Sequence, residues 1–305
     1  MSVAEFRELI DPKNPKDSEE VLKELRKMVI LKGLPDQDGL ECDREDGLRG
    51  TIWKIFLRIP SIDSQKYLAL VAQKKCKFGD KIRDDTFRTV IKDDKFKQGV
   101  AEVKLVRVLN AYVHSISDSD SKMPYVQGMS LILAPFIYVM PEVDAFFCYS
   151  RLLQYFCPNY VLPALEGVHA ATDLLDEVLK VADNELFTYL KERFMIAKLY
   201  AFSPLMSFMA DTLPVNELLQ IWDFLLAYGM HLNVLCVAAQ HILIRDVIFR
   251  DTKNAISKLK DLPELRTIPA KQLITKAIEI AKGLPEDLYT KLVRHPWDPL
   301  MVRKK

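Results

Sequence analysis

Two short polar motifs lie within otherwise apolar helical sequence and could carry chemistry. They are Ile82-x-x-Asp85-x-x-Arg88 and Tyr125-Val126-Gln127-Gly128-Met129. The Arg88 guanidinium could neutralise charge that develops on a transferring phosphoryl group, and the Gln127 carboxamide could orient an attacking water. Neither group needs a shifted pKa for such work. The two motifs therefore fit a protein that completes another protein's active site better than one with its own acid, base or nucleophile.

Each motif alone also has an ordinary structural interpretation. Arg88 follows the mixed charges of Lys81, Arg83, Asp84 and Asp85, a pattern typical of a solvated helix face. Gln127 precedes a glycine, which is typical of a turn or a helix cap. Only the combination of the two motifs with the rest of the chain favours the functional interpretation.

The composition is that of a soluble globular protein. The 305 residues are 49% hydrophobic and 28% charged, enough for one large domain or two ordinary ones. Lys and Arg number 43 against 42 Asp and Glu, so no overall field attracts nucleic acid, and we predict no nucleic-acid partner. The runs Lys74-Lys75-Cys76-Lys77 and Arg303-Lys304-Lys305 are local basic candidates, for which ordinary surface is the favoured interpretation.

Several classes of site are not expected. The five cysteines are an odd number at spacings that match neither a disulfide framework nor a zinc site, so we predict reduced cytosolic thiols and no metal. No apolar run is long enough for a transmembrane segment. Phosphate-binding glycine loops of the Gly-x-x-x-x-Gly-Lys-Ser/Thr and Gly-x-Gly-x-x-Gly types are also missing, so we expect no cofactor in this chain.

Apolar residues recur with helical spacing along nearly the whole chain, which predicts an all-α fold. The clearest helix begins after Leu213, with Pro214 in its first turn and Gly229 just past its end. Asp183 or Asn184 can cap another helix, whose apolar stripe would reach Phe194. A further stripe begins at Val103, near the start of a helix over 100–113. We predict an N-terminal helical segment at 1–39, a main domain at 40–255 and a docked C-terminal helical extension at 256–305.

The order of four motifs resembles that of TBC domains, GTPase-activating domains that act mainly on Rab GTPases. The motifs are Leu48-Arg49-Gly-Thr-Ile-Trp53, the two motifs described above, and Ile221-Trp222-Asp223 after Leu213-Pro214. The compact layout is similar to the cell-cycle branch of this family, which restrains mitotic exit or septation. The resemblance thus implies that a TBC fold fills most of the chain.

The same resemblance implies roles for single residues. Arg88 and Gln127 would be catalytic fingers that enter the GTPase site in trans, with Gln127 replacing the GTPase's own glutamine. Asp85 would hold the guanidinium or the neighbouring backbone. Ile82, Tyr125 and Gly128 would support the fingers. A buried structural network would contain the remaining motif residues, namely Arg49, Trp53, Trp222 and Asp223. Ser130 departs from the family pattern, in which asparagine usually follows Gly-Met.

The resemblance also implies partners. The first is a small Ras/Rab-like GTPase, which itself binds Mg²⁺ and GTP, and the second is a scaffold subunit of a two-component activator. The chain would be cytoplasmic and would reach a spindle pole body or centrosome through its partner. Three other interpretations stay open at this point: a non-catalytic module that binds a GTPase or scaffold, a Rab activator in vesicle traffic, and a purely structural helical adaptor.

Overall fold

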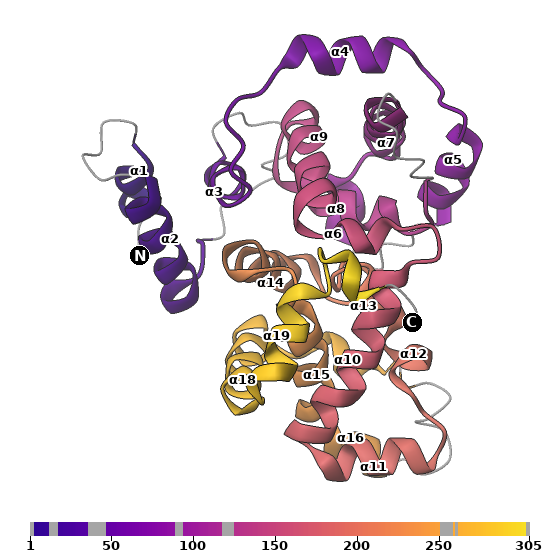
Figure 1. Ribbon diagram of the computed structural model, residues 1–305. Coiled ribbons are helices and arrows are strands. Elements are labelled where there is room, and N and C mark those ends of the chain that lie inside the picture. Colours follow the sequence, from indigo (N-terminus) through magenta and orange to yellow (C-terminus); the bar gives the residue numbers. More distant parts are fainter. Residues whose placement is uncertain are drawn as a thin grey trace. The chain divides into compact units, whose positions relative to one another are not determined.

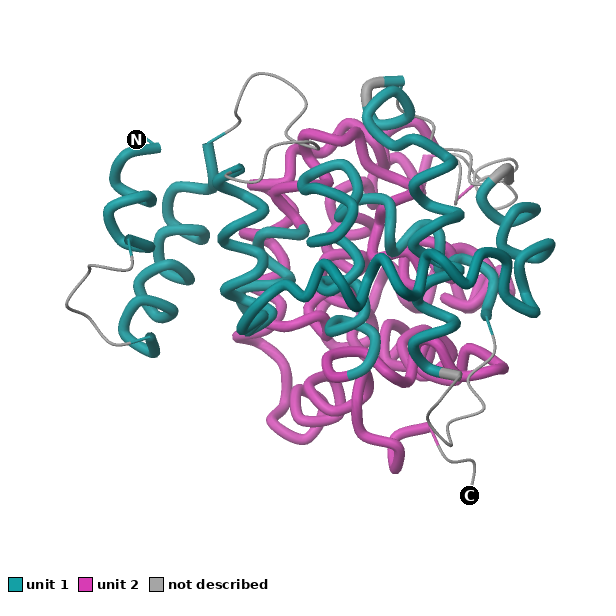
Figure 2. The backbone as a smooth tube through the Cα atoms, turned by 90° about the horizontal axis from the view of Figure 1, so that it is seen from above, with its two compact units in different colours: residues 1–154, 222–228 teal, residues 155–221, 229–305 magenta. Residues whose placement is uncertain are grey.

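The computed structural model describes residues 3–11, 18–35, 47–88, 94–117, 125–250, 259 and 262–302 (Figure 1). Every regular element in these ranges is helical, and none of them contains a strand. This confirms the predicted all-α fold. Contacts divide the chain into two compact units, one formed by 1–154 with 222–228 and the other by 155–221 with 229–305 (Figure 2).

The first unit holds both candidate finger motifs. Its elements are α1 (Val3–Ile10), α2 (Ser18–Lys32), α3 (Leu48–Phe56), α4 (Ser64–Ala72), α5 (Gly79–Arg88), α6 (Asp94–Gly99), α7 (Glu102–Ser117), α8 (Met129–Val139), α9 (Glu142–Arg151), the start of the π-helix η2 (Leu152–Phe156) and the end of α14 (Val215–Tyr228). Nearly every residue of α8 is buried, and the helix continues across Pro135. This apolar helix is packed by α7 and α9 and forms the centre of the unit.

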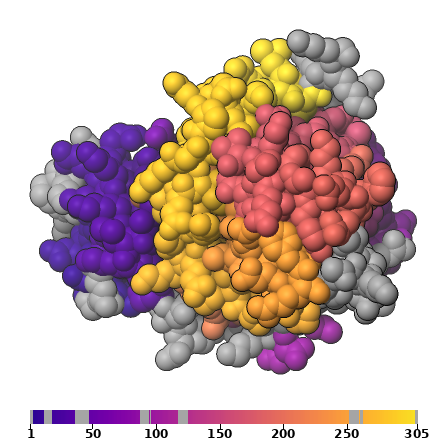
Figure 3. Space-filling view, turned by 90° about the horizontal axis from the view of Figure 1, so that it is seen from below, coloured from indigo at the N-terminus to yellow at the C-terminus, as the bar shows by residue number. Residues whose placement is uncertain are grey.

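The second unit is built around α15 (Leu232–Leu243), a helix that is buried almost throughout. Its other elements are η3 (Pro158–Val161), α10 (Glu166–Ala182), α11 (Asn184–Glu192), α12 (Ala197–Tyr200), α13 (Phe202–Met206), the start of α14, α16 (Arg245–Arg250), η5 (Pro263–Arg266), α18 (Ala270–Gly283), α19 (Glu286–Arg294) and η6 (Pro299–Met301). Helix α18 packs on α15, and α19 packs on α10. Figure 3 shows the yellow C-terminal segment beside red and orange segments of the second unit. The predicted boundary of a C-terminal extension at 256 stays a prediction.

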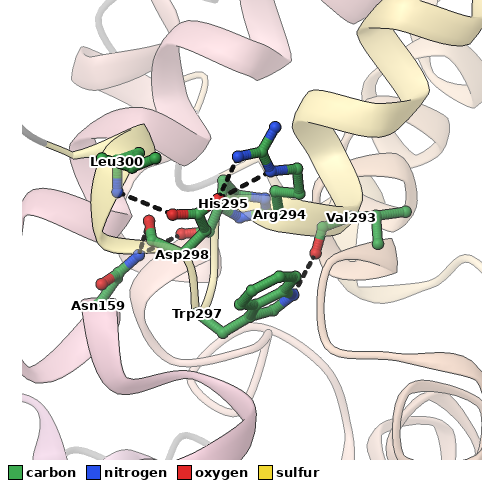
Figure 4. A network of polar contacts seen from close by, with 7 residues as sticks. All are labelled: Asn159, Val293, Arg294, His295, Trp297, Asp298 and Leu300. Carbon is green, nitrogen blue, oxygen red and sulfur yellow. Dashed lines mark hydrogen bonds and ion pairs between the residues drawn. The ribbon is translucent and has the colours of Figure 1, made fainter.

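A polar network within the second unit joins Asn159 to residues that follow α19 (Figure 4). The buried Asn159 side chain donates from Nδ2 to the carbonyl oxygens of His295 and Asp298, both at 2.9 Å. The Asp298 carboxylate accepts from the Leu300 amide at 2.9 Å and from Arg294 Nε at 2.8 Å. These bonds satisfy backbone groups after α19, where the helix can no longer do so.

Two stripe residues are not in the core, contrary to the prediction. Helix α11 ends at Glu192, and Phe194 follows it with a φ of +59° and 87% of its side chain exposed. Val103 lies in the first turn of α7 and is 68% exposed. Helical spacing alone does not tell where a helix ends or where its neighbours stop. Of the two candidate caps of α11, Asp183 fills the role by accepting from the Leu186 amide at 3.0 Å.

Four cysteines lie in the described ranges, Cys76, Cys148, Cys157 and Cys236, and all are buried free thiols. Cys42 lies outside those ranges. Burial raises the pKa of the Cys236 thiol to about 12, so this group stays protonated and inert at neutral pH. In the part of the chain that the structure describes, no helix combines the length and apolarity that a bilayer span requires.

Candidate functional site

One buried carboxylate, that of Asp85, joins helix α5 to the loop that carries Gln127. Its Oδ2 accepts hydrogen bonds from the Tyr125 hydroxyl at 2.5 Å, the Gly128 amide at 3.1 Å and the Ser130 hydroxyl at 2.9 Å. Asp85 is buried, with only 8% of the residue exposed. Hydrogen bonds to a charged acceptor in such surroundings are stronger than those between neutral groups. The carboxylate therefore fixes the conformation of residues 125–130.

The loop presents Gln127 to solvent. Gln127 is exposed, whereas its neighbours Tyr125, Val126 and Gly128 are buried. Gly128 precedes α8 with a φ of +94° and a ψ of −8°, a left-handed conformation that favours glycine. This turn directs the Gly128 amide to Asp85. The sequence Tyr-x-Gln-Gly thus forms a held turn with one exposed carboxamide.

Tyr125 acts as a hydrogen-bond donor within this loop. Burial raises the pKa of the Tyr125 phenol, and the negative charge of Asp85 raises it further, so the hydroxyl keeps its proton. The carbonyl oxygen of Tyr125 accepts from Lys81 Nζ at 2.8 Å. Helix α5 therefore holds the loop at two points, through Lys81 and through Asp85, which lie four residues apart on one helix face.

The other residue predicted to be catalytic, Arg88, is the last residue of α5, and its side chain lies outside the described part of the structure. Ile82 is fully buried one turn before Asp85, as a packing residue would be. The contacts described for Asp85 are with the Gln127 loop. The structure thus adds a role for Asp85, that of holding the Gln127 loop, and the two predicted roles, holding the Arg88 guanidinium or the neighbouring backbone, stay predictions. The catalytic roles of Arg88 and Gln127 stay predictions.

The four residues predicted to form a structural network do lie together in the first unit. Arg49 Nε contacts Asp223 Oδ1 at 3.2 Å, and Trp53 Nε1 donates to the same oxygen at 2.7 Å. The rings of Trp53 and Trp222 stack with centroids 5.8 Å apart. All four residues are at most 4% exposed. A buried ion pair within an aromatic cluster has the geometry of a core element rather than of a contact surface.

Two residues of this site had no supporting role in the sequence prediction. Ser130 is fully buried and donates to Asp85, so the hydroxyl that departs from the family pattern still makes a polar contact within the loop. In the sequence, Lys81 stands only as one member of a charged run. Its spacing of four residues from Asp85 was the available signal for Lys81, because residues so spaced share a helix face. Among the described residues, no group of His, Cys, Asp and Glu has the arrangement of a metal site.

The fold is that of a TBC domain. The solved TBC domain of a Chlamydomonas flagellar RabGAP superposes with a TM-score of 0.68 over 90% of this chain and 88% of its own, at 17% identity. The family model described as the Rab-GTPase-TBC domain matches residues 46–248. The chain belongs to this family.

Two curated relatives match nearly the whole chain. A Dictyostelium discoideum relative described as a mitotic check point protein is 39% identical over an alignment of 300 positions, which covers 95% of this chain and 80% of the relative. Cell division control protein 16 of Schizosaccharomyces pombe is 37% identical over 288 residues, 94% of this chain and 92% of its own. The match at 46–248 lies within the predicted main domain, whose exact boundaries stay a prediction.

Proposed function

We propose that this protein is a GTPase-activating protein that supplies Arg88 and Gln127 in trans to a small Ras/Rab-like GTPase. The observation that carries the proposal is the Asp85 carboxylate, which holds the Gln127 turn through Tyr125, Gly128 and Ser130. A loop held this firmly, with an exposed carboxamide at its tip, suits a group that must meet a partner in a fixed geometry.

Arg88 provides positive charge for the transition state. When phosphoryl transfer proceeds, negative charge develops on the phosphate oxygens, and an arginine from a second protein accelerates hydrolysis by about 10³ to 10⁵ in other GTPases. Arg88 ends α5, the helix that also holds the Gln127 loop through Lys81 and Asp85. In this proposal, one helix thus carries Arg88 and also holds the loop of Gln127.

Gln127 orients the attacking water. Its carboxamide both donates and accepts hydrogen bonds, so it can bind the water and align it with the phosphorus atom. This work requires placement rather than a shifted pKa. Because the turn is already ordered by Asp85, docking orders little additional backbone, which lowers the entropic cost of forming the catalytic complex.

The GTPase, in this proposal, binds the nucleotide and Mg²⁺, and this chain binds neither. The names of the curated relatives, a mitotic check point protein and a cell division control protein, support a role in cell division, which we specify as the restraint of mitotic exit or septation. We extend the proposal to a two-component activator, in which a scaffold subunit brings the chain to the spindle pole body or centrosome.

The test is single-turnover GTP hydrolysis by a panel of purified Rab-like and Ras-like GTPases, with this protein and its Arg88→Ala variant. Arg58→Ala is the control, since Arg58 is an exposed arginine of the same unit. The proposal expects acceleration that Arg88→Ala removes and Arg58→Ala retains. Binding without acceleration would favour a non-catalytic module, and activation confined to membrane-traffic Rabs would favour a Rab activator.

A further inference from the structure

A pocket of about 490 Å³ opens on the first unit between α4, the turn that follows it, α5 and α7. This volume lies within the ~300–1,000 Å³ typical of ligand sites. One wall is apolar and consists of Val71, Val103 and Val106. Val103 is 68% exposed, so covering it would remove apolar surface from water.

The rim of this pocket is mainly basic. Lys74, Lys75, Arg83 and Arg107 line it, against one acidic residue, Glu102. Two of the cations already have carboxylate partners, because Lys75 pairs with Asp80 at 2.6 Å and Arg107 pairs with Glu142. Within the described ranges, Lys74 and Arg83 form no ion pair. These two side chains keep their positive charge available for a ligand.

The turn between α4 and α5 is ordered by a contact with α7 and by close packing of Lys75 on Gly79. Asn110 of α7 accepts from the Cys76 amide at 2.8 Å and donates to the Val106 carbonyl at 2.7 Å. The Lys75 side chain lies so close to Gly79 that a Cβ atom there would be 2.2 Å from Lys75 Cγ. The pocket is therefore formed before any partner binds, which favours affinity.

We propose that this pocket docks an acidic, amphipathic segment of a second protein. The valine wall would cover aliphatic side chains of that segment, and Lys74 and Arg83 would pair with its carboxylates. Gly79 and Arg83 line the pocket, whereas Asp85 holds the Gln127 loop. At 100° per residue, Asp85 lies roughly 160° around α5 from Arg83. The docking surface is thus separate from the site of the proposed activity, and its test needs no GTPase.

The test uses a fluorescein-labelled helical peptide as the probe and the full chain as the receptor. The peptide has leucines at i, i+3, i+4 and i+7 spacing, flanked by glutamates. A matched peptide keeps the leucines and carries lysines in place of the glutamates. Fluorescence anisotropy gives the Kd for the wild type and for three variants, each first checked for folding by circular dichroism. The variants are Lys74→Glu/Arg83→Glu, Val103→Ala and Lys66→Glu, the last an exposed lysine of α4 outside the pocket lining.

The proposal expects the acidic peptide to bind and the lysine peptide not to bind. Reversing Lys74 and Arg83 should weaken binding about tenfold, and raising the salt concentration should weaken it as well. Val103→Ala should weaken binding roughly threefold because less apolar area is covered. Lys66→Glu should leave Kd unchanged. The proposal would be overturned if the acidic peptide did not bind or if both peptides bound equally. It would also be overturned if the double variant kept the wild-type Kd, or if inorganic phosphate at the concentration of the peptide displaced it.

Discussion

Replacing Asp85 tests the physical basis of the site. Asp85→Ala removes the acceptor of three buried hydrogen bonds, those of the Tyr125 hydroxyl, the Gly128 amide and the Ser130 hydroxyl. Asp85→Asn keeps the volume and one carbonyl oxygen but loses the charge and the second acceptor. We expect both variants to loosen the Gln127 turn, with the alanine variant more affected.

The size of the effect follows from the number of donors left without a partner. A buried donor without a partner costs about 1–3 kcal/mol, so three of them set an upper range of roughly 3–9 kcal/mol for Asp85→Ala. Relaxation and entry of water reduce this, and we expect about 3–5 kcal/mol. For Asp85→Asn we expect about 1–3 kcal/mol, because a neutral carbonyl oxygen in the place of Oδ2 accepts more weakly from the three donors, and the new NH2 group faces the Gly128 amide, which lies 3.4 Å from Oδ1.

Urea unfolding measures the stability change, and hydrogen exchange of a peptide covering 125–140 measures the loop directly. The control is Asp84→Asn, because Asp84 is an exposed carboxylate of the same helix. Exchange at the Gly128 amide should rise in Asp85→Asn and stay unchanged in Asp84→Asn. Activation of the GTPase should fall about 10- to 100-fold in Asp85→Asn, since small misplacements of catalytic groups cost this much. Unchanged exchange and unchanged stability in Asp85→Asn would refute the assigned role.

Three further predictions concern other parts of the chain. Arg49→Met should destabilise the first unit by about 3–5 kcal/mol in urea unfolding, because it leaves the Asp223 carboxylate buried, and Arg49→Met/Asp223→Leu should recover much of this. Gly128→Ala should cost about 1–2 kcal/mol and slow GTPase activation, because φ is +94° there. Acid should destabilise the second unit, because burial lowers to about 4 the pKa values of three histidines, His231, His241 and His295. The unfolded state binds their protons first as the pH falls below about 6.5, so stability drops between about pH 6.5 and 4, by about 2 kcal/mol per histidine at pH 5.

Each of these outcomes can also fail. An Arg49→Met variant as stable as the wild type would mean that the ion pair does not support the core. Gly128→Ala with full activity would mean that the left-handed turn does not set the position of Gln127. For the histidines, hydrogen exchange in α15 and α19 gives the free energy of unfolding from pH 7 to pH 4, after correction for the intrinsic exchange rate at each pH. A free energy that does not change with pH would contradict the argument from burial.

The sequence was sufficient for the helical class, for a physical reason. Helical spacing of apolar residues is a local property, so α14 and its boundaries at Pro214 and Gly229 could be predicted. Long-range pairs such as Arg49 with Asp223 came from the family resemblance, because a separation of 174 residues leaves no local signal. The exposure of Val103 and Phe194 depends on where neighbouring elements end, which periodicity does not encode.

The roles of Ser130 and Lys81 were missed for a related reason. Their hydrogen bonds depend on how closely α5 approaches the loop over 125–130, and this approach is a tertiary property. Asp85 was placed next to its finger motif by sequence, but the sequence left open whether it holds a guanidinium or a backbone. The contacts with Tyr125 and Gly128 add a role that the sequence did not indicate, that of holding the Gln127 loop.

The most direct test of the proposed mechanism is a crossed single-turnover experiment on the glutamines. GTP hydrolysis is measured for the wild-type GTPase and for a variant without its own catalytic glutamine, each with this protein, with Gln127→Ala and with Gln73→Ala as the matched exposed glutamine. If Gln127 orients the water in trans, activation persists when the GTPase lacks its glutamine and is lost in Gln127→Ala with either GTPase. Activation that survives Gln127→Ala but is lost when the GTPase lacks its own glutamine would contradict the mechanism.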